Sequence, residues 1–477
     1  MQDRQDVSQA RVGLSKRLTL FDFFAIGFGA IIGVGWVISV GDWLNIGGGP
    51  LPVILAFAAG ALLLFPVGKV YGDLAARQAC AGGAMVYARM AFGRRWGFVT
   101  GWFLALGYIM LCPWEIIAIG QVAEALFPAL KILPLYSIGE YTIYLPTLLI
   151  NMAVALVIIV SNYKGVDKVA RLQRALVATL MGVGLLAIIT ALVKGDAGAF
   201  LTAAVAMPRN PQVNRLTGFL AVLTITPFYF AGFDAIPQEA EESRSAEDSG
   251  KISRVVVGSI GAACAFYVLV IIGISGAMPW RDLLGYSLPA AAAYEVGLGM
   301  PIVAKIILIG ALCGLISTFN SFFMAGARVL LALGRERMVS EKLGYIHPKY
   351  QTPYVANRVI AVVSILGSFL GKGLLLPITN VCSFSFVFAW MVVALAAWKL
   401  NRKAAAASRT IQRLAIGSSV LLFLLLVLPW SAGALAWPME WGIVFGWLIA
   451  GCVMGAISAR KKKREYPTAT AGDTKEE

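Results

Sequence analysis

The chain has 477 residues, of which 59% are apolar and only 14% are charged. Soluble proteins carry about a quarter of their residues as charged side chains, so this composition excludes an ordinary soluble domain. The net charge is +15, but no basic stripe interleaved with aromatic residues accompanies it, and we expect no nucleic-acid partner. In a membrane protein the same excess is expected from Lys and Arg retained on the cytoplasmic side.

Twelve apolar segments are predicted to cross the bilayer as helices, because about 20 apolar residues suffice to span it. They run over residues 21–42, 51–71, 97–126, 144–162, 173–193, 217–237, 254–276, 302–330, 357–371, 374–398, 413–430 and 440–458. No convincing cleavage site follows the first of them, so we expect a retained helix and not a signal peptide. The sequence therefore predicts an all-α, multi-pass membrane protein.

The distribution of basic residues tests this number of spans. If the N-terminus is cytoplasmic, most of the 40 Lys and Arg residues fall in cytoplasmic segments. The exceptions are Lys131, Lys194, Arg209, Arg215, Arg281, Lys305 and Lys372. One span more or fewer would remove the asymmetry, so we expect both termini on the cytoplasmic side of the inner membrane. The acidic loop 238–253 is expected to be a solvated linker, and the basic run 461–464 to lie near anionic lipid.

Two apolar segments are interrupted, at residues 27–36 (GFGAIIGVGW) and 226–237 (TPFYFAGFDAIP). A helix break inside lipid is tolerated only where it lines a buried cavity. Breaks at corresponding positions of two halves are typical of the binding site of a transporter. Since the breaks fall in the first and sixth spans, we expect two inverted five-helix halves and two further helices. The corresponding boundaries are a cytoplasmic segment 1–20, halves 21–193 and 194–400, the added pair 401–459 and a cytoplasmic tail 460–477.

The first break is rich in glycine. Gly29, Gly33 and Gly35 have no Cβ, which lets the backbone unwind and a ligand approach it closely. Amide groups at the start of the following half-helix would favour an anion such as a carboxylate. The alternative is that Gly29 and Gly33 only permit close helix packing.

The second break combines proline, glycine and aromatic residues. Pro227 removes a backbone donor, and Gly232 permits unusual dihedral angles. Carbonyl groups freed there would suit an ammonium group or a cation. Phe228, Tyr229 and Phe230 are candidate aromatic walls with a cation–π face, although each of these rings would also fit ordinary packing.

Four polar residues inside the spans are candidates for coupling or amine binding. Asp234 and Glu115 place carboxyl groups at membrane depth, where they are costly and therefore functional candidates. The alternatives are that Asp234 caps local backbone and that Glu115 makes a structural hydrogen bond. The hydroxyls of Ser317 and Thr318 would coordinate an ion or link neighbouring helices.

The remaining chemistry argues against an enzyme. The six cysteines form no CxxC pair, and the single histidine, His347, lies in a predicted loop. We therefore expect no disulfide framework, no metal site and no cofactor. A nucleophile–histidine arrangement is also missing from the sequence.

Four stretches together resemble one transporter superfamily. They are residues 29–35 (GAIIGVG), 81–87 (AGGAMVY), 230–234 (FAGFD) with Glu241 and Glu242, and the segment from Ser317 to Glu336. Over roughly residues 15–400 the chain resembles the amino acid–polyamine–organocation superfamily. The resemblance implies a five-plus-five inverted-repeat fold with twelve helices. It also implies secondary transport of amino acids or related amines, often coupled to protons or by exchange.

The resemblance also implies a substrate site. The substrate carboxylate would meet the unwound backbone of the first break, and the amino group would meet carbonyls of the second, with Phe228 as the gating aromatic. The implied substrate-binding residues are Ala30, Ile31, Gly33, Val34, Gly35, Phe228, Phe230, Ala231 and Gly232.

Three positions depart from the superfamily pattern. Val34 stands where many members have Ser or Thr, so a hydroxyl contact to the carboxylate is lost. Trp36 is bulkier than the usual aliphatic residue, and Leu180 replaces the lysine of many proton-coupled relatives. Glu115 and Asp234 then become the coupling candidates, while a sodium site near Ser317 and Thr318 stays open.

The expected function is a permease that moves an amino acid by alternating access, coupled to protons. The alternative is an exchanger or facilitator of amines or organic cations such as polyamines, which Val34 and the aromatic sixth span favour. The pair of broken helices is typical of a carrier and not of a channel. A membrane enzyme or a nutrient receptor finds little support in the sequence.

Overall fold

The computed structural model describes residues 13–33, 35–138, 141–205, 214–370, 375–402, 405–429, 431 and 433–465. Val34, residues 1–12 of the expected segment 1–20 and the part of the expected tail 460–477 that follows Glu465 lie outside the described residues. Within the described part, eleven helical segments are long and apolar enough to cross a membrane, judged by length and composition, and a shorter apolar helix accompanies them. The predicted all-α membrane fold is confirmed, while the precise set of twelve spans stays a prediction.

The long helices follow the expected segments closely. They are α2 (Leu20–Ile31) with α3 (Gly35–Ile38), α5 (Pro50–Arg77), α7 (Arg94–Leu126), α8 (Leu145–Lys164), α9 (Val166–Lys194), α11 (Arg215–Phe230) with α12 (Ala235–Gln238), α13 (Ala246–Ala277), α16 (Pro301–Arg335), the shorter α17 (Tyr354–Gly367), α18 (Leu375–Leu400), α19 (Ala406–Val427) and α20 (Met439–Glu465).

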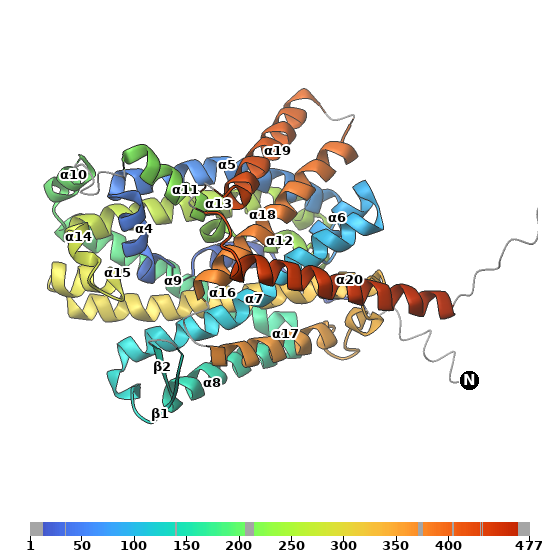
Figure 1. Ribbon diagram of the computed structural model, residues 1–477, viewed down its shortest axis with the longest axis horizontal. Helices are drawn as coiled ribbons and strands as arrows, with labels where there is room; N and C mark the ends of the chain where they lie inside the picture. Colours follow the sequence, from blue (N-terminus) through green and yellow to red (C-terminus); the bar gives the residue numbers. More distant parts are fainter. Residues whose placement is uncertain are drawn as a thin grey trace, which may run out of the picture.

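Short elements connect them. These are α4 (Val40–Gly47), α6 (Gly83–Phe92), α10 (Ala197–Val205), α14 (Trp280–Leu283), α15 (Pro289–Ala292), and the single turns η2 (Pro128–Leu130), η3 (Ala240–Glu242), η4 (Ala293–Gly297), η5 (Glu341–Gly344) and η6 (Ser368–Leu370). An antiparallel hairpin of β1 (Pro134–Ile138) and β2 (Tyr141–Tyr144), which the sequence did not predict, joins α7 to α8. In Figure 1 this hairpin lies at the lower left of the bundle.

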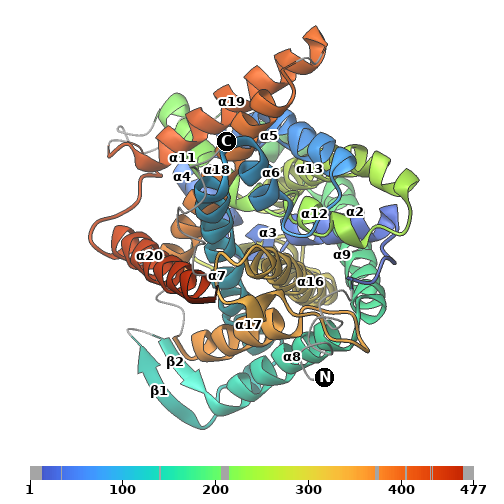
Figure 2. The same ribbon diagram turned by 90° about the vertical axis from the view of Figure 1, so that its right-hand side faces the viewer.

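The helices pack as one bundle around the two interrupted elements. Most of the long helices run along the same direction in Figure 1, and α19 rises away from them. The view along the bundle in Figure 2 places α3 near the middle, with α20 on the outside. The α2 helix packs on α13, α16 and α9, and α11 packs on α5 and α4. The interrupted helices are therefore enclosed by others, which is where an irregular backbone is tolerated at membrane depth.

Both interruptions occur where the sequence places glycine. The first helix stops at Ile31 and resumes at Gly35, and the second stops at Phe230 and resumes at Ala235. Gly232 has a φ of +127°, a conformation that residues with a side chain rarely adopt. A Cβ built there would lie 2.6 Å from the Cβ of Ala30. The two breaks thus touch each other, and glycine makes that approach possible.

The expectation of a solvated linker at 238–253 is wrong. This segment forms the end of α12, η3 and the start of α13, and Glu239 and Glu242 are fully buried in it. The Nε of Arg328, itself buried on α16, donates to Glu242 Oε1 at 2.6 Å. Acidic side chains that looked like a solvated run instead pack around a buried guanidinium, which compensates the cost of burying charge.

Two carboxyl groups of this segment have pKa values shifted in opposite directions. Burial raises the pKa of Glu239 to about 8; nearby Arg328 offsets part of the rise, and Glu242 adds to it. Burial also acts to raise the pKa of Glu241, but the Arg335 guanidinium donates to both of its oxygens, at 2.7 and 3.0 Å. The pKa of Glu241 consequently lies below its usual value.

Candidate functional site

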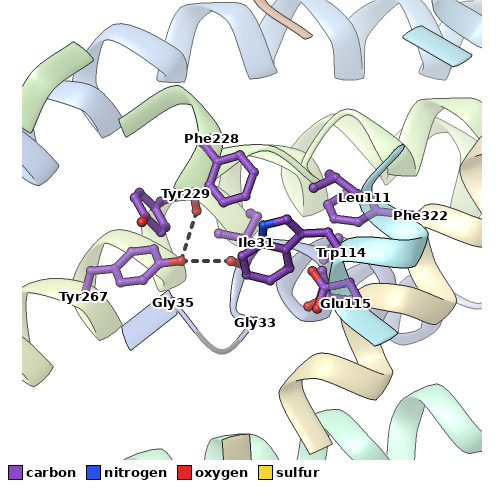
Figure 3. A pocket seen from close by; sticks show the side chains of 12 residues that line it. Ile31, Gly33, Gly35, Leu111, Trp114, Glu115, Phe228, Tyr229, Tyr267 and Phe322 are labelled. Carbon is purple, nitrogen blue, oxygen red and sulfur yellow. Dashed lines mark hydrogen bonds between the residues drawn. The ribbon is translucent and has the colours of Figure 1, made fainter. Parts of the chain in front are cut away.

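A cavity of about 360 Å³ lies where the two broken helices meet. Five helical elements contribute to its wall, and Figure 3 shows their side chains converging on one space. The lining residues are Ala30, Ile31, Gly33 and Gly35 from the first break, Leu111, Trp114 and Glu115 from α7, Phe228 and Tyr229 from α11, Tyr267 from α13, and Thr318 and Phe322 from α16.

Tyr267 connects the two breaks through one hydroxyl group. Its oxygen lies 2.8 Å from the carbonyl oxygen of Ile31 and 3.0 Å from that of Tyr229 (Figure 3). A hydroxyl has a single proton, so it donates to one of these carbonyls at a time. Both acceptors lie at or near the C-terminal end of a helix, where carbonyls lack intrahelical partners. The side chain therefore stabilises the relative position of the two helix ends.

Aromatic rings form much of the cavity wall. Trp114 and Phe228 are in edge contact with their centroids 6.0 Å apart, and Phe228 meets Tyr229 in the same way at 5.2 Å. Tyr229 in turn packs edge-on against the buried ring of Trp43 at 4.7 Å. Such a wall offers apolar area for a side chain and ring faces for a cation.

Glu115 is the one ionisable carboxyl group that lines this cavity in the described structure. The residue is only 3% exposed, and its Oε2 is buried without a hydrogen-bond partner among the described residues. An isolated buried carboxylate is costly unless a cation or a proton compensates it. The site therefore has a group that either holds a proton or pairs with a positively charged ligand.

Ser317 and Thr318 hold α16 against the first break. The Ser317 hydroxyl donates to the carbonyl oxygen of Gly29 at 3.1 Å. The Thr318 hydroxyl lies 2.9 Å from that oxygen and 2.9 Å from the Gly314 carbonyl oxygen, and donates to one of them at a time. Gln173 Nε2 lies within hydrogen-bond distance of Ser317 Oγ at 2.9 Å and of the Ala25 carbonyl at 3.0 Å. In this arrangement the hydroxyls act as links between helices, and of the two residues only Thr318 reaches the cavity.

Asp234 lies behind the cavity wall. It accepts hydrogen bonds from the Tyr108 hydroxyl at 2.8 Å and from the Gly232 amide at 3.0 Å. Its carboxylate thus holds the second break in shape, which is the capping alternative considered above. Since it does not line the cavity, nothing in its position brings it to a substrate.

Three further residues expected in the site, Phe230, Ala231 and Gly232, also lie outside the cavity lining. Successive residues of a helix are 100° apart, so Phe230 faces nearly opposite to Phe228. Phe230 is fully buried and packs against Phe57 and Tyr267 instead.

Four lining residues were not expected from the sequence: Leu111, Trp114, Tyr267 and Phe322. Leu111 carried a usable signal, since it lies four residues before Glu115 and so on the same face of the helix. Trp114, next to Glu115 in the chain, is about 100° away around the helix and carried none. Tyr267 and Phe322 carried none, because they reach the cavity only through the packing of α13 and α16. Val34 lies outside the described residues, and Leu180 is buried in α9.

Comparison with known proteins identifies the family. The family model described as amino acid permease matches residues 18–457. The branched-chain amino acid permease BcaP of Bacillus subtilis is 26% identical over 482 residues, which cover 97% of each chain. The amino-acid permease RocE of the same organism is 25% identical, covering 80% of this chain and 79% of RocE. A methylthioribose transporter of B. subtilis is 22% identical, with 82% of each chain covered. The chain therefore belongs to the amino acid permease family of membrane transporters.

Proposed function

We propose that this protein carries a neutral amino acid with an apolar side chain across the cell membrane, by alternating access at the cavity between the broken helices. One observation carries the proposal: the two interrupted helices enclose a cavity into which a single buried carboxyl group, Glu115, projects. Family membership supports transport as the activity. The similarity to BcaP, a branched-chain amino acid permease, and to RocE, an amino-acid permease, supports an amino acid as the substrate.

The wall of the cavity favours an apolar substrate side chain. Ile31, Leu111 and Phe322 provide aliphatic and aromatic contact, while Glu115 and the hydroxyls of Thr318, Tyr229 and Tyr267 are the polar groups present. The substrate carboxylate would approach the backbone between Ala30 and Gly35. In support of this, a Cβ at Gly33 would lie 3.0 Å from Thr318 Oγ1, so the missing side chain keeps this approach open.

Glu115 is the proposed proton carrier. Its carboxyl group has no partner among the described residues, so its ionised form gains most from a nearby ammonium group. The Glu115 carboxyl group would thereby couple binding of the substrate amino group to release of the proton. Leu180 occupies the position at which many relatives carry a lysine, which leaves the coupling role to another side chain. The Asp234 carboxyl group already accepts hydrogen bonds from Tyr108 and from the Gly232 amide, which stabilise the second break.

A second candidate is an exchanger or facilitator of amines. The cavity lining contains one acid and no Lys or Arg to pair with a substrate carboxylate. That charge pattern, together with the aromatic wall, is compatible with a ligand that carries only an ammonium group.

Counterflow into liposomes distinguishes these functions. We would reconstitute the purified protein and compare labelled L-leucine with 3-methylbutylamine, its decarboxylated analogue, with and without an inward proton gradient. Saturable leucine uptake that the gradient accelerates is the expected result. Uptake of the amine alone would support the second candidate, and uptake of neither by protein that is folded in the membrane would contradict the proposed substrate class.

A further inference from the structure

A second cavity, of about 430 Å³, lies toward the far end of α7. Its wall comes from α7, β2, α8 and η6, and it shares no lining residue with the cavity between the broken helices. Figure 1 shows β2 beside α8, at the end of the bundle that carries the hairpin. Glu124, in this wall, follows Glu115 by nine residues, which separates the two along α7 by about 13 Å.

A carboxylate without a charged partner lines this second cavity. Glu124 Oε1 accepts a hydrogen bond from the Thr147 hydroxyl at 2.9 Å. Among the described residues, no Lys or Arg forms a salt bridge with it, unlike Glu241 and Glu242 elsewhere in the chain. The lining of this cavity therefore holds one acidic side chain and no Lys or Arg, a pattern that suits a cationic ligand.

Asn151 adds an unpaired amide to the same wall. The residue is 6% exposed, and its Oδ1 is buried with no hydrogen-bond partner in the described structure. A buried polar atom without a partner costs roughly 1–3 kcal/mol, so native structures rarely leave one unless a ligand or water satisfies it. The amide rests against Gly120, where a Cβ would lie 2.8 Å from Asn151 Nδ2 and 2.8 Å from Thr147 Cγ2. The glycine thus makes room for this amide.

We propose that this second cavity is a binding site for a primary ammonium group, carried by a small organic amine or by an amino acid. The Glu124 carboxylate would accept one hydrogen bond of the ammonium, and the Asn151 amide oxygen would accept another. The side chains of Ile117 and Leu148, also in the wall, would contact the hydrocarbon part of the ligand. An ammonium group on a hydrocarbon chain fits better than a bare metal ion, because Ile117, Ile143 and Leu148 share the wall with a single carboxyl group.

This proposal does not depend on the proposed function, because the two cavities have separate residues. The test is the binding stoichiometry of the purified full-length protein for labelled 3-methylbutylamine and, in a parallel arm, labelled L-leucine. Glu124→Gln keeps the shape of the side chain. We expect it to lower the affinity of one class of binding site for the probe by about tenfold or more. Gly120→Ala should remove the same class by displacing Asn151. Gly182→Ala is the matched control, since a Cβ there meets nothing within 4 Å.

The outcomes separate the two proposals. Loss of one bound probe molecule per protein in Glu124→Gln supports the site. If 3-methylbutylamine binding is lost, the site takes a free amine, and if L-leucine binding is lost, it takes an amino acid. Unchanged stoichiometry and affinity for both probes in Glu124→Gln would overturn the site, whatever the counterflow assay shows. A failure of counterflow in the wild type, with Glu124-dependent binding intact, would instead reject the proposed function alone.

Discussion

Replacing Gly232 by alanine perturbs the contact on which the site depends. The backbone there has a φ of +127°, which costs a residue with a side chain about 1–3 kcal/mol. The added Cβ would lie 2.6 Å from Ala30 Cβ, 2.8 Å from the Ala30 carbonyl carbon and 2.9 Å from the Ile31 amide nitrogen. Two of these three are backbone atoms of the other break, so no rotamer change relieves the overlap.

The expected result is a loss of uptake larger than the loss of stability. Separating the two breaks displaces Ile31, which lines the cavity. It also moves the carbonyl oxygen of Ile31, which accepts the hydrogen bond of Tyr267. We would measure the thermal unfolding midpoint in detergent together with counterflow of labelled L-leucine in liposomes. Gly258→Ala is the control, because it lies on α13 with open space around its Cβ. Wild-type uptake and melting temperature in Gly232→Ala would refute the reasoning.

Three further changes test other parts of the account. Tyr267→Phe keeps the ring but removes a hydrogen bond worth about 1 kcal/mol, and should lower the counterflow rate about fivefold; an unchanged rate would mean that the bridge to Ile31 is dispensable. Gly33→Leu places a side chain against Thr318 and should abolish uptake without preventing membrane insertion, as judged by extraction from membranes. Because the folded pKa of Glu239 is raised to about 8 from 4.5, the folded protein keeps a proton that the unfolded chain loses between these values. Stability should therefore fall by up to about 1.4 kcal/mol per pH unit as the pH rises through this window, and Glu239→Gln should flatten the dependence of the melting temperature on pH.

The sequence predicted the elements of the site better than their orientation. Glycine and proline interrupt the helices at residues that can be recognised without a structure, and an acid at membrane depth is conspicuous. Five of the nine expected substrate-binding residues line the cavity: Ala30, Ile31, Gly33, Gly35 and Phe228. Phe230 does not, because it lies two residues after Phe228 on α11 and so faces nearly the opposite way. Ala231 and Gly232 follow the end of that helix, where the turn at Gly232 sets the direction of the chain, and periodicity alone does not specify that turn.

Contacts between distant segments could not be predicted. The acidic segment after α12 looked solvated because its partner, Arg328, lies 86 residues after Glu242. Tyr267 reaches the first break across more than 230 residues of chain, and no local pattern distinguishes it from a packing aromatic. The hairpin between α7 and α8 was missed because its strands lie in a short connection between two strong helical signals.

The most direct test of the central claim is proton-driven accumulation by Glu115→Gln. The amide keeps the shape of the side chain but neither carries a proton nor pairs as an anion with an ammonium group. In liposomes, we expect this variant to retain counterflow of L-leucine, with a raised KM because the substrate ammonium loses its anionic partner, and to lose accumulation driven by an inward proton gradient. Glu247→Gln, an exposed carboxyl-to-amide change on α13, is the control and should accumulate leucine as the wild type does. Gradient-driven accumulation by Glu115→Gln at the wild-type level would contradict the account.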